Sequence, residues 1–235
     1  MDEQELRQRF ALLTTAHLAD ACIRAQLGVR CAPSPVRAVV PGSRLAGRVC
    51  PARHAGSVDV FLEAFQRASA GDVLVADNGG RLDESCAGDL VALEAQAAGL
   101  AGIVIWGLHR DTADIVEAGL PGFSMGSIPT GPLRLHARVP DALESATVGD
   151  WTVGREDLVL GDDDGVLFVP ASRAADLFAL AETIRDTERR QADQIHAGTS
   201  LRSQVQFDAY LARRQQEPSL TFREHLRSVR GAIEE

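Results

Sequence analysis

The chain has 235 residues, of which 45% are hydrophobic and 24% charged, a composition typical of a globular protein with one sizeable core. Its formal net charge of −9 argues against a nucleic-acid-binding protein, which usually presents a basic face. All 24 basic residues are arginines, which excludes Schiff-base chemistry through a lysine amine and a phosphate-binding loop that depends on lysine.

The cysteines and the apolar segments indicate where the protein works. Cys22, Cys31, Cys50 and Cys86 form no C-x-x-C pair, which argues against a zinc ribbon or a redox dithiol. The sequence begins with a charged stretch that lacks the apolar centre of a signal peptide, and no apolar run approaches the roughly 18 residues of a membrane helix. We therefore expect a cytoplasmic protein with free thiols and no membrane partner.

Apolar spacing in the first third of the chain predicts helices and strands. Residues 3–13 are predicted to form a short amphipathic helix, and Thr14 or Thr15 is expected to cap a second helix. Prolines and alternating valines in residues 30–50 indicate strands and turns. Apolar residues at helical spacing then predict a third helix over residues 57–68.

The middle of the chain alternates strand and helix. The pattern predicts, in order, a strand with a glycine-rich loop (71–80), a helix with a glycine just past its end (within 88–102), a strand (102–111) and a short helix (112–119). This alternation favours a parallel or mixed sheet in an α/β fold, where ligands bind beyond the carboxyl ends of the strands. We therefore expect Asp77–Gly80 and Gly107–Asp111, which lie at the ends of two such strands, to meet at one crevice.

The last part of the chain changes from strands to helices. Residues 120–170 are β-rich, and residues 171–196 are predicted to form a long charged helix. Beyond this helix, aromatic and leucine side chains on polar helices predict an arm that docks on the core or on a neighbouring subunit. We divide the chain into a catalytic domain, residues 1–197, and a C-terminal helical arm, residues 198–235, expected to be an oligomer contact.

The segment Gly88-Asp89-Leu90-Val91 opens one of the predicted helices. The first amides of a helix lack intrahelical partners, and with the helix dipole they suit a small anion such as a carboxylate. Asp89 also has a simpler explanation, because aspartate is a preferred helix N-cap.

Arg110 and Asp111 end the most apolar predicted strand, "GIVIWGLHRD". The planar fork of an arginine matches a carboxylate or a keto acid, and an aspartate is a hard oxygen ligand for Mg²⁺ or Mn²⁺. Adjacent residues at a strand end can approach one pocket from different sides, one binding substrate and the other binding metal. The alternative is an ordinary surface ion pair.

The stretch "GDLVALEAQAAGLAGIVIWGLHRD" resembles the core signature of the RraA-like family in its helix start, its small-residue helix, its apolar strand and its final Arg-Asp. Weaker similarity runs from Thr14 to Pro170. The family includes class II 4-hydroxy-4-methyl-2-oxoglutarate / 4-carboxy-4-hydroxy-2-oxoadipate aldolases and regulators of ribonuclease E activity. The resemblance implies a compact α/β/α swivelling-domain sandwich, assembled as a homotrimer or homohexamer with its sites at subunit interfaces.

For an aldolase, the resemblance implies a site for the pyruvyl half of a small 2-oxo acid. The amides of Gly88, Asp89, Leu90 and Val91 are expected to hold its carboxylate. Arg110 is expected to contact both the keto oxygen and the carboxylate.

The same resemblance implies a divalent metal cation, Mg²⁺ or Mn²⁺, as the cofactor. Asp111 is expected to ligate the metal, and Asp89 to touch metal-bound water. Glu188 from the late helix of a neighbouring subunit is expected to contact metal-bound water as well, with Asp186 as the second choice.

The implied reaction is retro-aldol cleavage of a 4-hydroxy-2-oxo acid to pyruvate. The metal withdraws charge from the keto group, and Arg110 stabilises the enolate that bond cleavage leaves. Decarboxylation of oxaloacetate gives the same enolate and is a natural companion activity, with Asp89 as the proton shuttle through a water. The alternative is a non-catalytic regulator that binds an RNA-processing enzyme.

One position departs from the pattern of these aldolases. Their substrate-gripping asparagine falls near Val58, and a valine cannot make that hydrogen bond. Arg53, His54 and Ser57 are the candidate substitutes, so the fragment released beside pyruvate is left open.

Three further features have simpler explanations than chemistry. We expect His109 to face solvent at the strand end and Cys86 to be a small packing residue. The acidic run Asp162–Asp164 lacks the spaced ligands of a calcium loop and is predicted to be a turn.

Overall fold

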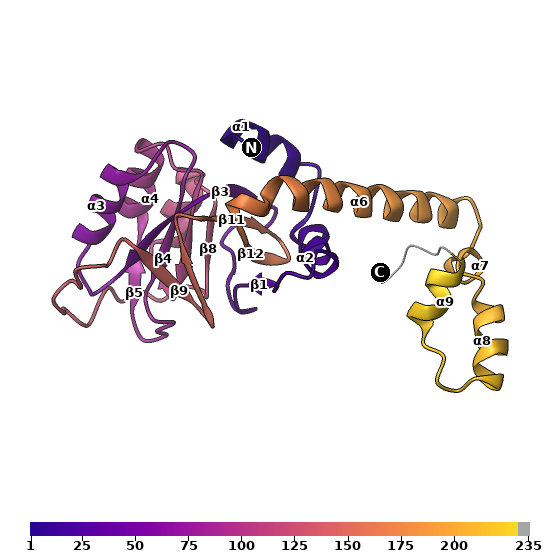
Figure 1. The fold of residues 1–235 in the computed structure, drawn as a ribbon. Helices are drawn as coiled ribbons and strands as arrows, with labels where there is room; N and C mark the ends of the chain where they lie inside the picture. The colour runs from indigo at the N-terminus through magenta and orange to yellow at the C-terminus, as the bar shows by residue number, and fades with distance from the viewer. Residues whose placement is uncertain (230–235) are drawn as a thin grey trace.

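The computed structural model describes residues 1–229, and its centre is a mixed sheet of eight strands (Figure 1). The strand order is β1-β12-β11-β3-β4-β6-β8-β2. The strands are β1 Arg30–Cys31, β2 Arg37–Ala38, β3 Leu45–Arg53, β4 Val73–Asp77, β6 Gly102–Trp106, β8 Gly122–Ser124, β11 Asp157–Asp162 and β12 Gly165–Pro170. The four strands β3, β4, β6 and β8 run parallel, and the strands that flank them pair antiparallel.

Helices connect the parallel strands. In chain order, α3 (Asp59–Arg67) joins β3 to β4, α4 (Asp89–Ala97) lies between β4 and β6, and α5 (Thr112–Ala118) lies between β6 and β8. The predicted alternation, and with it the α/β fold, is confirmed. Two short strands, β5 (Ser85–Ala87) and β7 (Leu108–His109), pair in parallel and position the starts of α4 and α5.

The sheet curls, which gives it an inner and an outer face. Along β4, Val73 and Val75 belong to the inner core, whereas Leu74 points outward into the core beneath α3 and α4, as strand alternation requires. A hairpin of β9 (Ser145–Val148) and β10 (Trp151–Gly154) covers the inner face and contributes to its core.

A second group of helices packs on β11 and β12. It comprises α1 (Glu3–Phe10), α2 (Thr15–Arg24) and α6 (Ala174–His196), the last preceded by a short 3₁₀ turn, Ala171–Arg173. Thr14 caps α2 by accepting a hydrogen bond from the His17 amide, 3.2 Å away. Figure 1 shows these helices on one side of the sheet and α3 and α4 on the other, which confirms the layering expected of an α/β/α sandwich.

The far end of α6 carries the C-terminal arm. Figure 1 shows its helices α7 (Leu201–Gln204), α8 (Phe207–Gln216) and α9 (Phe222–Val229) beyond the core. Its aromatic rings pack on one another, with the centroids of Tyr210 and Phe222 5.0 Å apart, so the arm does not use them to dock on the sheet. Contact with a neighbouring subunit stays a prediction, and residues 230–235 of the predicted arm lie outside the described residues.

The state of the cysteines agrees with the expectation of free thiols. All four cysteines are free, and Cys22, Cys50 and Cys86 are buried. In the part of the chain that the structure describes, no helix combines the length and apolarity needed to cross a membrane.

Candidate functional site

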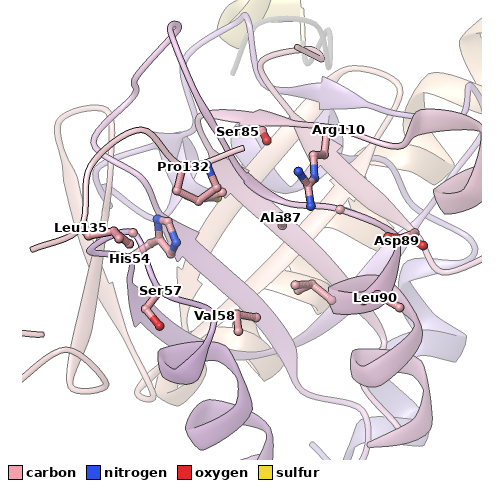
Figure 2. Close-up of a pocket in the computed structure, with 14 residues that line it drawn as sticks. His54, Ser57, Val58, Ser85, Ala87, Asp89, Leu90, Arg110, Pro132 and Leu135 are labelled. Atoms are coloured by element: carbon pink, nitrogen blue, oxygen red, sulfur yellow. The ribbon is translucent and has the colours of Figure 1, made fainter. Parts of the chain in front are cut away.

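A cavity of about 390 Å³ lies at the carboxyl ends of β3, β5 and β7 (Figure 2). His54, Gly88 and Arg110 are the first residues after these three strands, and all three line it. The complete lining is His54, Gly56, Ser57, Val58, Ser85, Cys86, Ala87, Gly88, Asp89, Leu90, Val91, Arg110, Pro132 and Leu135. Five residues predicted for the substrate site, Arg110 and the four at the start of α4, therefore share one cavity.

The start of α4 is built from a glycine. Gly88 is the N-cap, in an extended conformation, and a Cβ atom on it would lie 2.3 Å from Oδ2 of Asp111 and 3.2 Å from Cγ of Arg110. Because only glycine leaves that space, the helix start and the Arg110–Asp111 pair can approach this closely. Asp89 is the first helical residue and makes no side-chain cap, so its expected alternative role as N-cap is wrong.

Arg110 and Asp111 form an ion pair beside this helix start. Nε of Arg110 lies 3.2 Å from Oδ2 of Asp111, and the two side chains are 46% and 35% exposed. The Arg110 amide donates to the Ala87 carbonyl oxygen at 3.0 Å, which ties the pair to β5. Asp111 has left-handed backbone angles (φ 57°, ψ 43°), a strained conformation for a non-glycine residue that is often associated with functional sites. The ion pair therefore lies at the edge of the cavity, with Arg110 in the lining and Asp111, the predicted metal ligand, next to Gly88 but outside the lining.

His54 lies across the cavity from Arg110 and Asp89, close to Pro132 and Leu135 (Figure 2). The ring is only 7% exposed and stacks on Phe61 with centroids 5.2 Å apart. Its Nδ1 lies 3.0 Å from Oδ1 of the fully buried Asn78, and its Nε2 is buried without a hydrogen-bond partner. Burial lowers the pKa of His54, so the ring is neutral at neutral pH.

A buried glutamate anchors the loop that forms the cavity wall. Glu84 is 1% exposed, and its Oε2 accepts hydrogen bonds from the amides of Leu133 and Arg134 at 2.6 and 3.2 Å. Arg81 and Arg134 pair with the same carboxylate. The loop between β8 and β9 is thereby fixed, although it contains no helix or strand of its own over residues 129–139.

Of the three simpler expectations, one is wrong and two are confirmed. His109 was expected to face solvent, but it is 4% exposed, with Nδ1 2.7 Å from Ser124 Oγ and Nε2 3.0 Å from Thr112 Oγ1. The pairing of β7 with β5 draws it inward, and burial lowers its pKa. Cys86 is a packing residue as predicted, and burial raises the pKa of its thiol to about 12. The acidic run is also confirmed as a turn, between β11 and β12.

Glu188 and Asp186 do not line the cavity of their own chain. Both lie on α6, on the other side of the sheet from α4 (Figure 1). Oε2 of Glu188 is 3.1 Å from Nε2 of His17, and Asp186 pairs with the adjacent Arg185. The role of Glu188 at a neighbouring subunit's site stays a prediction.

The ends of β4 and β6 meet as predicted, but none of Asp77–Gly80 lines the cavity. The Asn78 amide donates to the Trp106 carbonyl oxygen at 3.0 Å, which joins the ends of β4 and β6. Asn78 lies behind His54 rather than in the lining, and Oδ2 of Asp77 accepts from the Thr147 amide at 3.0 Å. Pro132 and Leu135 were missed, because nothing in their segment marks a loop that returns to this cavity.

The metal was predicted at Asp111 and Asp89. Within residues 1–229, no group of three or more histidine, cysteine, aspartate or glutamate side chains lies close enough together to hold a metal ion. A metal at this cavity would therefore take only part of its ligands from side chains of one chain.

Comparisons with known proteins agree with this architecture. A relative in Halalkalibacterium halodurans, named "Putative 4-hydroxy-4-methyl-2-oxoglutarate aldolase", is 29% identical over 135 residues, which cover 56% of this chain and 59% of the relative. The matched region covers less than two thirds of the length of each of the first curated relatives.

Solved structures match over more of the chain. An uncharacterised protein from Pseudomonas syringae pv. tomato has a TM-score of 0.73 and 27% identity, over 84% of this chain and 95% of that one. RraAS2 from Streptomyces coelicolor, described as an unusual member of the RNase ES inhibitor RraA protein family, has a TM-score of 0.70 and 24% identity, over 81% of this chain and 98% of that one. The sequence profile of the RraA-like family, described as Aldolase/RraA, matches residues 15–168, and this chain therefore belongs to the RraA-like family.

Proposed function

We propose that this protein is a divalent-metal-dependent lyase that cleaves a 4-hydroxy-2-oxo acid to pyruvate by retro-aldol chemistry. The observation that carries the proposal is the convergence of Arg110 and the start of α4 at one cavity, with Asp111 paired to Arg110 and close to Gly88 at its edge. A helix N-terminus, a guanidinium and a carboxylate match what a reacting pyruvyl unit needs at its carboxylate, its keto oxygen and its metal. The aldolase names of curated relatives support the same chemistry.

The start of α4 and Arg110 would bind the pyruvyl half. The amides of Leu90 and Val91 belong to the first turn of α4, so they have no intrahelical acceptor and carry the positive end of the helix dipole. The half-exposed Arg110 guanidinium can donate to the keto oxygen and stabilise the negative charge that develops there as the enolate forms.

The residues around Gly88 fit a hard divalent cation. Asp111, with Asp89 beside it at the helix start, offers carboxylate oxygens, and Mg²⁺ is usually bound by one or two carboxylates together with waters and substrate. Two carboxylates therefore suffice, although residues 1–229 hold no larger cluster. When bound, the ion polarises the keto group as a Lewis acid.

The protein's own groups can complete the proton transfers. Cleavage of the C3–C4 bond leaves electrons on C3, which takes up a proton to become the methyl group of pyruvate. Asp89 lines the cavity and makes no cap hydrogen bond, so its carboxylate is available to deliver that proton through a water. Loss of carbon dioxide from oxaloacetate gives the same enolate, and we propose it as a companion activity.

We further propose that the working unit is a homotrimer or homohexamer. Glu188 lies away from the cavity of its own chain, and its carboxylate is 50% exposed, so it is available to the site of another copy. Size-exclusion chromatography with light scattering measures the assembly directly, and a monomer at working concentration would contradict this proposal.

The test of the proposed function is pyruvate release coupled to lactate dehydrogenase. Oxaloacetate and 4-hydroxy-4-methyl-2-oxoglutarate are offered with Mg²⁺ or Mn²⁺, and EDTA serves as the control. We expect turnover that EDTA abolishes. No turnover, combined with no metal-dependent exchange of the methyl protons of pyruvate in D₂O, would contradict the lyase and favour the regulator that binds an RNA-processing enzyme.

A further inference from the structure

The two ends of the cavity differ in charge. Arg110, the start of α4 and Asp89 lie at one end, and His54, Ser57, Val58, Pro132 and Leu135 form the other, which we call the far wall (Figure 2). Among the fourteen lining residues, all in the described part of the chain, Arg110 is the single arginine. The far wall therefore offers a tail of the substrate one neutral imidazole, one hydroxyl and apolar surface.

Arginines that flank the far wall are already engaged in ion pairs, although Glu63, the partner of Arg138, also pairs with Arg67. Each pairs with a carboxylate: Arg53 with Asp141, Arg81 with Glu84, Arg134 with Asp83 and Glu84, and Arg138 with Glu63. None of these four arginines lines the cavity. A second carboxylate on the substrate would thus lie against apolar groups, with no arginine of the far wall to pair with it. Burying an unpaired carboxylate costs binding free energy.

The hydrogen-bond network fixes the tautomer of His54. Nη2 of Arg81 donates to Oδ1 of Asn78 at 2.7 Å, and a guanidinium can only donate, so this atom is the amide oxygen. Nδ1 of His54 lies 3.0 Å from the same oxygen and must therefore carry the proton that it donates. In the neutral ring Nε2 is left with a lone pair, and it is buried without a partner.

A buried acceptor at the far wall selects what it can contact. The Nε2 lone pair of His54 attracts a hydroxyl hydrogen and repels a carboxylate. An unpaired buried nitrogen carries a free-energy cost that a donor from a bound molecule removes, once a small shift of the ring or of the loop beside it opens Nε2 to the cavity. Val58 and Leu135, both exposed apolar side chains of the far wall, provide surface for an apolar tail.

We infer that the substrate is a 4-hydroxy-2-oxo monocarboxylate, whose 4-hydroxyl donates to His54 and whose remaining half is small, uncharged and apolar. The inference rests on the proposed lyase function and specifies its substrate class. In the reaction the O–H proton passes to Nε2 of His54, the C3–C4 bond breaks, and C4 becomes the carbonyl of a neutral aldehyde or ketone. The C3 enolate takes up one proton, which gives pyruvate and balances the cleavage.

The test compares two substrates that differ in one group. In 4-hydroxy-4-methyl-2-oxopentanoate a methyl group replaces the second carboxylate of 4-hydroxy-4-methyl-2-oxoglutarate. With Mg²⁺ present, we expect kcat/KM for pyruvate-producing cleavage, counted per molecule of substrate, to be at least about tenfold higher for the monocarboxylate, because an unpaired carboxylate loses that much or more. Equal values, or a preference for the dicarboxylate, would overturn the inference.

A variant pair tests the far wall directly. Leu135→Arg places a cation on the lining at a side chain that is 80% exposed, and Leu133→Arg places the same cation on the same loop outside the lining, at 63% exposure. We expect Leu135→Arg to shift the ratio of the two kcat/KM values about tenfold toward the dicarboxylate, as one charge-assisted pair allows, while Leu133→Arg leaves it unchanged. If Leu135→Arg leaves the ratio of the two kcat/KM values unchanged, the far wall does not contact the tail of the substrate.

Exchange of pyruvate methyl protons in D₂O, followed by NMR, separates the two proposals. This exchange needs only the pyruvyl end of the site, because pyruvate lacks the part of the substrate that would contact the far wall. Exchange together with a dicarboxylate preference, or with cleavage of neither compound, overturns the substrate inference and leaves the lyase chemistry standing. Absence of exchange and of cleavage overturns both.

Discussion

The two ends of the cavity are constructed in different ways. At the pyruvyl end the geometry is set by the backbone: the first turn of α4, the absence of a side chain at Gly88, and the left-handed backbone of Asp111 together position the Arg110 and Asp111 side chains. At the far wall they come from side chains, with His54 held by Asn78 and Phe61 and the loop held by Glu84. The first end has little freedom to change without loss of geometry, whereas the second changes with single side chains.

Because the two ends differ in construction, different measurements depend on each of them. Enolate formation from pyruvate and cleavage of a full substrate both need the pyruvyl end. Only cleavage also needs the far wall. Changes at the two ends should therefore give different patterns when exchange and cleavage are measured on the same protein.

The largest expected effect is at Asp111. Asp111→Ala removes the proposed metal carboxylate, and we expect kcat/KM for cleavage and the rate of pyruvate proton exchange each to fall at least about 10³-fold, since a Lewis acid contributes several kcal/mol. Asp114→Ala, which removes an exposed carboxylate from the same helix, is the matched control. Unchanged metal-dependent turnover in Asp111→Ala would refute the assignment.

Gly88→Ala tests whether the backbone sets the pyruvyl end. The added Cβ would displace the Asp111 carboxylate, because the two atoms would lie 2.3 Å apart. We expect both exchange and cleavage to fall about 10²-fold, the size typical of ångström misplacement of a catalytic group. Gly28→Ala, where a Cβ meets nothing within 4 Å, controls for the loss of a glycine. Full activity in Gly88→Ala would show that this close approach is not required.

His54→Phe should separate the two ends. Phenylalanine keeps a ring to stack on Phe61 but removes the acceptor nitrogen, so cleavage should fall about 10²-fold or more while pyruvate proton exchange is retained. His136→Phe, at an exposed histidine outside the lining, is the control. Parallel loss of both reactions would indicate that His54 supports the whole site rather than the far wall.

The smallest effect is on stability against pH. The pKa of His54 is lowered mainly by burial, also by Arg81, and is raised by Asn78, Glu84 and Asp59, with a net decrease. The unfolded chain therefore takes up a proton at higher pH than the folded chain. The contribution of His54 to the free energy of unfolding should therefore be at its maximum above about pH 6.5. It should decrease as the pH falls below that value, by at most about 1.4 kcal/mol per pH unit for this one group.

Urea unfolding at pH 7.5 and 5.5 measures this dependence. His109 has a lowered pKa as well and contributes with the same sign, so the wild type is compared with His54→Phe at each pH. The decrease between the two pH values should be smaller in the variant. An equal decrease in both proteins would show that His54 does not bind protons differently in the folded chain.

Local features made the pyruvyl end predictable from sequence. The start of α4 and the Arg110–Asp111 pair each lie within a few residues of a strand end, and α/β topology places such ends together. The order of strands and helices in the middle of the chain followed from the spacing of its apolar residues. The fit between Gly88 and Asp111 could not be predicted, because it depends on an interatomic distance between separate segments.

The far wall was predicted only in part. His54, Ser57 and Val58 were named as candidates near the substrate and line the cavity, whereas Arg53 does not, and Pro132 and Leu135 were missed. His54 and Leu135 are distant in sequence, and they meet only because the buried Glu84 draws the loop onto the cavity. A glutamate in "RLDESC" carries no sign of burial, since glutamates are mostly exposed. His109 was placed wrongly for a similar reason: its partner Ser124 comes from another strand, β8.

The use of backbone amides at the start of α4 has a consequence for how such a protein can evolve. The side chains of Leu90 and Val91 are not needed for the hydrogen bonds that their amides offer, so these positions can accept substitutions without removing the anion site. The tail preference is encoded elsewhere, in residues 54–58 and 132–135. A lineage can therefore acquire a new substrate through changes in two short segments while the reaction itself is inherited intact.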